Sequence, residues 1–324
     1  MSRYYSGPVS DHFDGKRFFG PQQSGGKSLG DLFKWMTSGE KAKWPRWIEN
    51  ARQPPPPTRV YGGEIRLTMI GHVTVLIQTA GLNIVTDPVW SKFASPTQFA
   101  GPRRVRAPGI AVADLPPIDL ILVSHSHYDH LDTRSLKQLV ALHDPLIITP
   151  LGNDAIIAKA APKARITAID WDEKVTFGDM IIEAEPVNHW SARSVWDRNE
   201  ALWAGFTLHG GGKRCFINCD SGFAGGWWAE RLMAKHAQID CALLPIGAYA
   251  PRWFMVDAHM NPEEAVRVHQ MLGHPPTLGY HWGTFQLTDE AIDEPPARLT
   301  AALTREGLNP TRFRTLDPGE GWLI

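Results

Sequence analysis

Three histidines and an aspartate occupy six consecutive positions at the start of the stretch HSHYDHLD, residues 125–132. The apolar run IDLILVS before it predicts a buried strand, and DTRSLKQLVALH after it has the leucine spacing of a helix. Such a loop is held at both ends. In its extended part His125 and His127 share a face, and the turn toward the helix aims Asp129 and His130 at a second point. Imidazole and carboxylate groups placed in this way predict a site for two metal ions.

Four ligands in one loop do not complete two coordination shells, so the hypothesis requires ligands at other strand ends. Three candidates follow strand-like apolar segments: His189 in PVNHWS, Asp220 in CFINCDSG and His281 in GYHWG. The predicted arrangement has His125, His127 and His189 on one ion, Asp129, His130 and His281 on the other, and Asp220 as a bridge. Each ion keeps an open position, as catalytic sites do. Two zinc ions suit this set, and its oxygen ligands are also compatible with iron or manganese.

The elements that position these residues alternate strands with helices from Val60 onward. IRLTMIGHVTVLIQTAGLNIVTDP predicts three short strands with turns at Gly71 and Gly81, and PLIITP predicts another buried strand. The second half repeats the order, with a histidine after MIIEAEPVN, an aspartate after a hairpin and the strand IDCALLPIG. We therefore expect an α/β (α+β) protein, a four-layer αββα sandwich whose two sheets bring their loops together along one edge.

Residues 1–58 differ in composition from the rest, being rich in Gly, Pro, Lys and aromatic residues and ending in the run Pro54 to Pro57. We predict an N-terminal extension of residues 1–58 ahead of a hydrolase domain of residues 59–324. Within it, LGDLFKWMTSGEKAKWPRWIEN combines aromatic and basic residues. This combination predicts either a short helix packed on the body or a patch that rests on lipid headgroups.

Composition narrows the class of protein. The chain has 33 basic and 34 acidic residues, a net charge of −1, so no global field attracts nucleic acid or anionic membrane. Cys215, Cys219 and Cys241 are too few for a disulfide framework, and we expect reduced core thiols. The N-terminus has no apolar signal region and no 18 apolar residues run together. We expect a cytoplasmic protein, with peripheral contact on the inner membrane face left open.

HSHYDHLD, followed by the later His, Asp and His, resembles the metallo-β-lactamase superfamily, whose fold is the αββα sandwich. Residues 60–295, among them GLNIVTDPVWS and LLPIGAYAPRWFMVDAHMNPEEAV, are similar to the N-acylphosphatidylethanolamine-hydrolysing phospholipase D family. The resemblance implies a dizinc phosphodiesterase that releases N-acylethanolamine and phosphatidic acid through attack of a metal-bound hydroxide on phosphorus. All seven ligand positions of the family pattern are present in this chain.

The resemblance also implies individual roles. It makes Asp129, Asp220 and His259 catalytic, and it places His259, Tyr249 and Trp253 on the substrate side. For His259, a packing role is the alternative. Asp87 in TDP is implied to orient a ligand histidine, with His72 as its companion.

Two other functions remain open on the sequence. The first is a lactone or cyclic-ester hydrolase of the ascorbate-phosphate-lactonase type, against which the segment PIGAYAPRWFM argues. The second is a non-catalytic, metal-stabilised binding protein, against which the retention of all seven ligands argues. A nuclease is disfavoured because no basic stripe is visible. The expected lack of an export signal disfavours a secreted β-lactamase.

Overall fold

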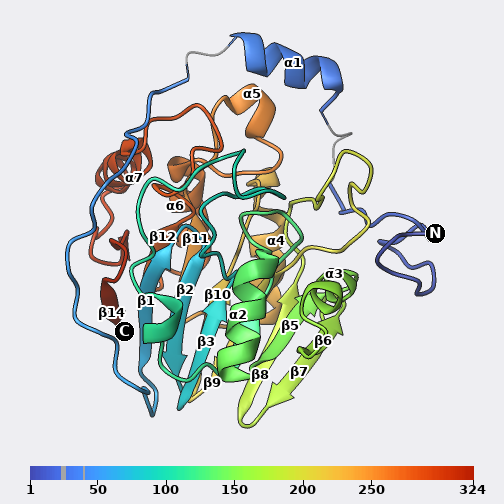
Figure 1. The fold of residues 1–324 in the computed structure, drawn as a ribbon. Coiled ribbons are helices and arrows are strands. Elements are labelled where there is room, and N and C mark those ends of the chain that lie inside the picture. The colour runs from blue at the N-terminus through green and yellow to red at the C-terminus, as the bar shows by residue number, and fades with distance from the viewer. Residues whose placement is uncertain (23–26, 39–40) are drawn as a thin grey trace.

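The computed structural model describes residues 1–22, 27–38 and 41–324 as two facing seven-stranded sheets with helices outside (Figure 1). The first sheet has the order β14 (Gly321–Leu323), β1 (Ile65–Gly71), β2 (Thr74–Thr79), β3 (Leu82–Thr86), β4 (Leu120–Leu122), β5 (Leu146–Pro150) and β6 (Arg165–Ile169). The second has the order β13 (Phe313–Arg314), β12 (Thr277–Tyr280), β11 (Cys241–Pro245), β10 (Lys213–Ile217), β9 (Gly205–Gly210), β8 (Met180–Glu185) and β7 (Lys174–Phe177). The two halves therefore repeat each other, as the sequence predicted.

Helices cover the outer face of each sheet. On the first sheet, α2 (Thr133–His143) and α3 (Asn153–Ala160) pack their leucine and isoleucine side chains on the strands. On the second, α4 (Trp227–Lys235), α6 (Pro262–Met271) and α7 (Glu294–Arg305) pack leucine, valine and alanine side chains on the strands. The remaining elements are α1 (Leu29–Ser38), the short α5 (Arg252–Met255) and the 3-10 turns η1 (Val112–Asp114) and η2 (Ala224–Gly226). The predicted αββα sandwich is confirmed.

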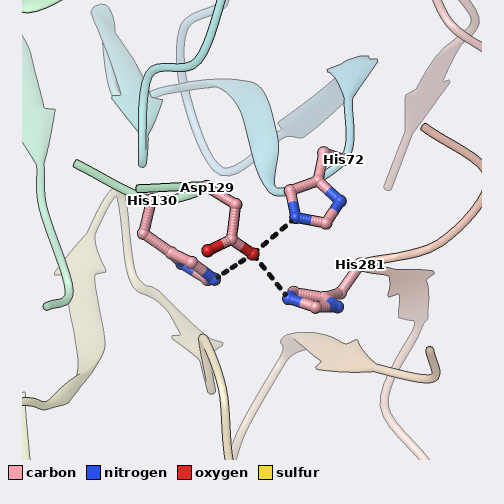
Figure 2. Close-up of side chains that lie close together, drawn as sticks. All are labelled: His72, Asp129, His130 and His281. Atoms are coloured by element: carbon pink, nitrogen blue, oxygen red, sulfur yellow. Dashed lines mark hydrogen bonds and ion pairs between the residues drawn. The ribbon is translucent and has the colours of Figure 1, made fainter. Parts of the chain in front are cut away.

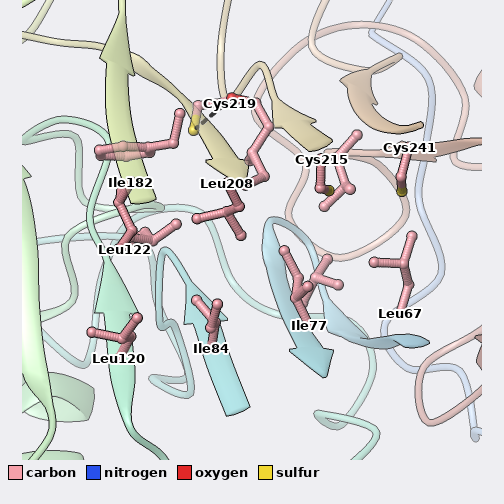
Figure 3. Close-up of a cluster of buried hydrophobic side chains, with 14 of the residues drawn as sticks. Leu67, Ile77, Ile84, Leu120, Leu122, Ile182, Leu208, Cys215, Cys219 and Cys241 are labelled. Carbon is pink, nitrogen blue, oxygen red and sulfur yellow. Dashed lines mark hydrogen bonds between the residues drawn. The ribbon is translucent and has the colours of Figure 1, made fainter. Parts of the chain in front are cut away.

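The core between the sheets is built from inward-facing aliphatic side chains of both halves, with Leu67, Ile84 and Leu122 on one side and Ile182 and Leu208 on the other (Figure 3). Burying each such side chain stabilises the fold by about 1.5–3 kcal/mol. The three cysteines lie in the same layer, and all are buried and free. The prediction of reduced core thiols is confirmed.

The parallel strands explain where the loops gather. Strands β3 to β6 run parallel in one sheet and β10 to β13 in the other, so their carboxyl ends meet at one edge of each sheet. The loop 125–132 follows β4 and ends at Asp132, which caps α2 by accepting a hydrogen bond from the Arg134 amide. Strand β4 is shorter than predicted, and beyond its carboxyl end the Ser124 amide donates to the Asp87 carboxylate instead of to a neighbouring strand.

The N-terminal segment packs on the body before α1. Phe13 and Phe18 are buried in the core between the second sheet and its helices, and the Phe18 amide donates to the carbonyl of Asn199. Residues 23–26 and 39–40 of the predicted extension lie outside the described residues, and the boundary at residue 58 stays a prediction. In the described part of the chain, no helix combines the length and apolar character needed to cross a bilayer.

Helix α1 packs on the body with one face and exposes apolar side chains on another, so it has features of both structures predicted from its sequence. Its Trp35 donates to Asp289 at 2.7 Å, and its ring centroid lies 4.9 Å from that of Phe254 of α5, so one face packs on the body. Phe33 and Met36, in contrast, are 69% and 76% exposed. Figure 1 shows this helix at the top of the molecule, above α5.

The N-terminal hairpin should loosen as pH rises. His12 Nε2 lies 2.7 Å from Asp170 Oδ1, and this hydrogen bond raises the pKa of His12 above 6.5. The stabilisation is complete below the unfolded-state pKa and is lost as pH rises through the raised folded-state value. We expect limited proteolysis of residues 1–22 to accelerate as pH rises above the ordinary histidine value of 6.5 and through the raised pKa of His12. His12→Gln should remove this dependence, and an unchanged profile in the variant would contradict the assignment.

Candidate metal centre

Four donor side chains converge where the loop after β4 faces the second sheet. His125 Nε2 lies 2.7 Å from His127 Nδ1, and His189 Nε2 lies 3.3 Å from the same His127 atom. Together with Asp220 they form a group in which one donor atom from each residue lies within 4.8 Å of the others. Three imidazoles and a carboxylate at this spacing match the requirements of a divalent transition metal.

A second group of donors surrounds Asp129. Its Oδ2 atom is 2.9 Å from His72 Nε2, 3.5 Å from His281 Nε2 and 3.6 Å from His130 Nε2. Figure 2 shows the three imidazoles directed at this carboxylate from separate segments of the chain. These four residues again offer donor atoms within 4.8 Å of one another. The loop thus contributes to two groups, as its spacing predicted.

Asp220 lies between the two groups. Its Oδ2 is 3.0 Å from His130 Nε2 and 3.7 Å from His189 Nε2, and its Oδ1 is 3.1 Å from His281 Nε2. The carboxylate therefore contacts histidines of both groups at once. This is the position that a bridging ligand requires.

The buried polar atoms of the cluster fit a metal. Nε2 of His127, His130 and His281 and Oδ1 of Asp220 are buried, and among the described residues none of them makes a hydrogen bond of good geometry, although His130 and His281 lie close to the Asp220 carboxylate. Buried polar atoms are normally satisfied, and an unsatisfied one costs about 1–3 kcal/mol. Cations coordinated by these atoms would remove that cost. The donor set is therefore suited to one ion in each group.

Neighbouring residues fix the ring orientations. Asp87 Oδ2 lies 2.7 Å from His130 Nδ1, and Asp87 itself accepts from the Ser124 amide and hydroxyl. His189 directs Nδ1 to the carbonyl of Ala258 at 3.0 Å. In both residues the contact with Nδ1 leaves Nε2 facing the cluster.

Burial and charge set the protonation states of the cluster. Burial lowers the pKa of His127 to about 4 and that of His189 to about 3, so both rings are neutral at pH 7. For His281, burial opposes the charge but the carboxylates of Asp220 and Asp129 raise the pKa to about 9. Burial also opposes ionisation of Asp220, but the charge of His130 and other histidines holds its pKa well below the usual range. The carboxylates are thus ionised and ready to bind cations.

The Asp87 contact predicts a metal-affinity defect. Asp87→Asn keeps the shape but weakens the hold on His130, and losing such a ligand-orienting carboxylate typically lowers metal affinity about 10–100-fold. Competition with a coloured chelator measures the change. Asp119→Asn is the matched control, because Asp119 lies just before β4, at the other end from the loop, and pairs with Arg59. Equal affinity in both variants would count against the role of Asp87.

The remaining predicted site residues differ in position. His259 joins the cluster, with Nδ1 3.9 Å from Asp220 Oδ2, and Arg252 holds its backbone by donating to the His259 carbonyl at 2.7 Å. Tyr249 is buried and its hydroxyl donates to Glu294 at 2.7 Å, and its substrate-side role stays a prediction. Trp253 is 41% exposed on α5, with the Lys34 ammonium 4.9 Å from its ring.

Sequence reasoning placed His72 beside Asp87 as a supporting residue, but the structure places its Nε2 against Asp129, within reach of the second group. Its backbone has a φ of +58° directly after β1. This sharp turn at the strand end directs the ring inward. In the sequence, the available signal for His72 as a site residue was its place directly after Gly71 at the end of a predicted strand. The role of Arg252 was missed because a hydrogen bond from an arginine side chain to a backbone carbonyl leaves no recognisable motif in the sequence.

Comparisons with known proteins agree with this centre. Residues 82–282 match the Beta-lactamase superfamily domain. The chain is 39% identical over 268 residues to N-acyl-phosphatidylethanolamine-hydrolyzing phospholipase D 1 of Caenorhabditis elegans, covering 79% of this chain and 74% of that protein. The chain belongs to this phospholipase D family, within the metallo-β-lactamase superfamily. As a member of the family it is a metal-dependent hydrolase.

One further relative and one solved structure are also similar to this chain. A mitochondrial N-acyl-phosphatidylethanolamine-hydrolyzing phospholipase D of Saccharomyces cerevisiae is 35% identical over 224 residues, 68% of this chain and 47% of the yeast protein. The solved isothiocyanate hydrolase from Delia radicum gut bacteria superposes with a TM-score of 0.63 at 21% identity, covering 79% of this chain and 98% of that chain. The second match shows the shared fold.

Proposed function

We propose that this chain is a dizinc phosphodiesterase that hydrolyses N-acylphosphatidylethanolamine to N-acylethanolamine and phosphatidic acid. The observation that carries the proposal is the pair of donor groups joined by Asp220. The relative of 39% identity, whose name states this activity, supports the substrate. His125, His127 and His189 would hold one ion, Asp129, His130 and His281 the other, and Asp220 would bridge them.

Two bound zinc ions would supply an activated water at neutral pH and a Lewis acid for the phosphoryl oxygen. Hydrolysis forms a bond between the water oxygen and phosphorus and breaks the bond from phosphorus to the N-acylethanolamine oxygen. Asp129 is ionised and accepts hydrogen bonds, so it would orient the water, whose proton would pass on toward the leaving oxygen.

His259 would return a proton to the leaving oxygen. Burial lowers its pKa to about 3, so the ring is neutral at pH 7, and its Nδ1 has no hydrogen-bond partner among the described residues. A neutral imidazole carries one N–H donor and one acceptor nitrogen. Both are needed to relay a proton between water and the leaving group.

Product analysis tests the assignment. The purified protein is incubated with N-acylphosphatidylethanolamine beside an Asp129→Asn control, and N-acylethanolamine is quantified. Product formation well above the control is expected, with two zinc ions per chain by elemental analysis. Hydrolysis of a lactone or a water-soluble diester without any N-acylethanolamine would overturn the lipid assignment and leave the metal assignment standing. Reloading with iron or manganese compares the metals.

A membrane-bound substrate suits the exposed side of α1, and we propose peripheral contact there on the inner face of the cytoplasmic membrane. Phe33 and Met36 lie on one side of the helix and point away from the body. Serine at both positions should weaken binding to phosphatidylcholine vesicles by more than about tenfold, because about 0.8 kcal/mol is lost per buried methylene and each substitution removes several groups of that size. Vesicle flotation measures this, and Val195→Ser, another exposed apolar residue, is the control. Undiminished flotation of the double variant would refute the contact.

A further inference from the structure

An open pocket of about 600 Å³ lies where residues 41–46 cross the loop 101–105. Its volume is in the range of ligand sites. The side chains that line it include Lys41, Arg46 and Arg103, and none of its described lining residues is acidic. Three cations therefore face one concavity in a chain whose net charge is −1. The positive field is local to this pocket.

Two bases of the pocket differ from their neighbours in having no ion-pair partner within the part of the chain that the structure describes. Arg104 turns inward and donates to the carbonyl of Val89 at 2.6 Å, and Arg106 pairs with Asp317 at 3.5 Å. Among the described residues, Arg46 and Arg103 make no ion pair or side-chain hydrogen bond, and both are exposed. Unpaired guanidinium groups in a concave site favour an anionic ligand, and their fork of donors matches phosphate.

The walls of the pocket are fixed by backbone contacts. The Ile48 amide donates to Val105 at 2.7 Å, and the Ala42 amide donates to Asp289 at 3.0 Å. Trp44 donates to the carbonyl of Glu290 at 2.9 Å. The extension is thus held against the loop, and the spacing of the bases is set by the fold.

The pocket is distinct from the metal centre but adjacent to it. Trp44 lines the pocket and also a second, small cavity that borders His72 and His281. A single side chain therefore takes part in both. A substrate whose phosphoryl group lay at the metal centre and an anion in the basic pocket would be two separate ligands.

The surroundings of the pocket indicate where such an anion comes from. Trp47, next to Arg46, is 45% exposed, and Phe99, two residues before Gly101 of the lining, is 83% exposed. Exposed aromatic residues beside basic residues are typical of surfaces that meet lipid headgroups. We infer that the pocket formed by Lys41, Arg46 and Arg103 binds the headgroup phosphate of an anionic phospholipid. This site goes beyond the proposed hydrolysis and does not depend on which ester the metal centre cleaves.

Vesicle binding by the full chain tests the inference. Binding to phosphatidylcholine vesicles is compared with binding to equimolar phosphatidylcholine and phosphatidic acid, for wild type and for Arg46→Gln/Arg103→Gln. Each base near an anionic surface contributes about fivefold, so the double variant should lose about 25-fold in affinity for the mixed vesicles and little for the neutral ones. Lys159→Gln/Lys163→Gln removes the same charge from exposed positions in and after α3 and should retain the preference.

Calorimetry with inorganic phosphate and with glycerol 3-phosphate separates the two sources of the phosphate. Saturable binding of these soluble ligands that requires Arg46 and Arg103, without any preference for mixed vesicles, would overturn the lipid source. Wild-type vesicle binding by Arg46→Gln/Arg103→Gln, or an equal loss in the α3 control, would overturn the pocket itself. Melting temperature and metal content verify that each variant is folded.

Lys41→Glu, which reverses one charge, should give a larger loss of affinity for the mixed vesicles than Arg46→Gln or Arg103→Gln alone.

Discussion

Asp220→Asn is expected to lower hydrolysis by about 10³-fold and to reduce the metal content of the purified chain. The residue contacts His130, His281 and His189 through its two oxygens, so its negative charge serves both donor groups. Asparagine keeps the shape and removes that charge. The expected effect exceeds the roughly 10–100-fold typical of a residue that only orients a ligand. Elemental analysis and product formation on the same preparation measure both changes.

A matched control for this variant is Asp197→Asn. Asp197 is similarly buried, but its carboxylate accepts hydrogen bonds from the Tyr4 hydroxyl and the backbone amides of Arg193 and Ser194 rather than from the donor residues. That variant should keep its full metal content. If Asp220→Asn retained two metals and wild-type turnover, the bridging assignment would be wrong.

His259→Gln is expected to lower kcat on N-acylphosphatidylethanolamine by about 10²–10³-fold while the metal content stays unchanged. The reason is the loss of the proton relay to an alkoxide, which is a poor leaving group. Nitrophenolate needs no such proton. The same variant should therefore hydrolyse bis(4-nitrophenyl) phosphate nearly as fast as wild type.

The comparison of the two substrates separates a proton relay from packing. If His259 only supported the fold of the centre, both rates would fall together. His269→Gln is the structural control, because His269 is buried on α6 and contacts Thr277. Its melting temperature should fall with little change in the ratio of the two rates. A uniform loss for His259→Gln would rule out the relay.

The fold was predictable because its pattern is local and repeated. The strands around Gly71 and Gly81 and the helix after Asp132 follow from apolar spacing, turn residues and a capping aspartate, and the structure has them there. The convergence of the seven predicted ligands was also accessible, since each follows a strand and the carboxyl ends of parallel strands meet at one edge.

Contacts that depend on side-chain direction were not predictable in this way. The ring of His72 turns to Asp129 because the backbone there has a positive φ, which the letters GH do not specify. Tyr249 lies in a motif shared with the family, but its hydroxyl donates a hydrogen bond to Glu294 on α7, forty-five positions later in the chain. The basic pocket depends on how a segment outside the sandwich crosses a loop, and neither segment has a periodic pattern.

The placement of the donor groups has a consequence for the life of the protein in a cell. Each donor group takes ligands from both sheets. His125 and Asp129 extend from the first sheet, and the second sheet contributes His189, Asp220 and His281. Bound cations would therefore cross-link the two halves of the protein. Any ligand that binds only the folded state adds stability that grows with its free concentration. Chains made during metal starvation would lack this cross-link, would be less stable, and would be degraded sooner. The abundance of the protein would then follow the metal supply even when its synthesis is constant.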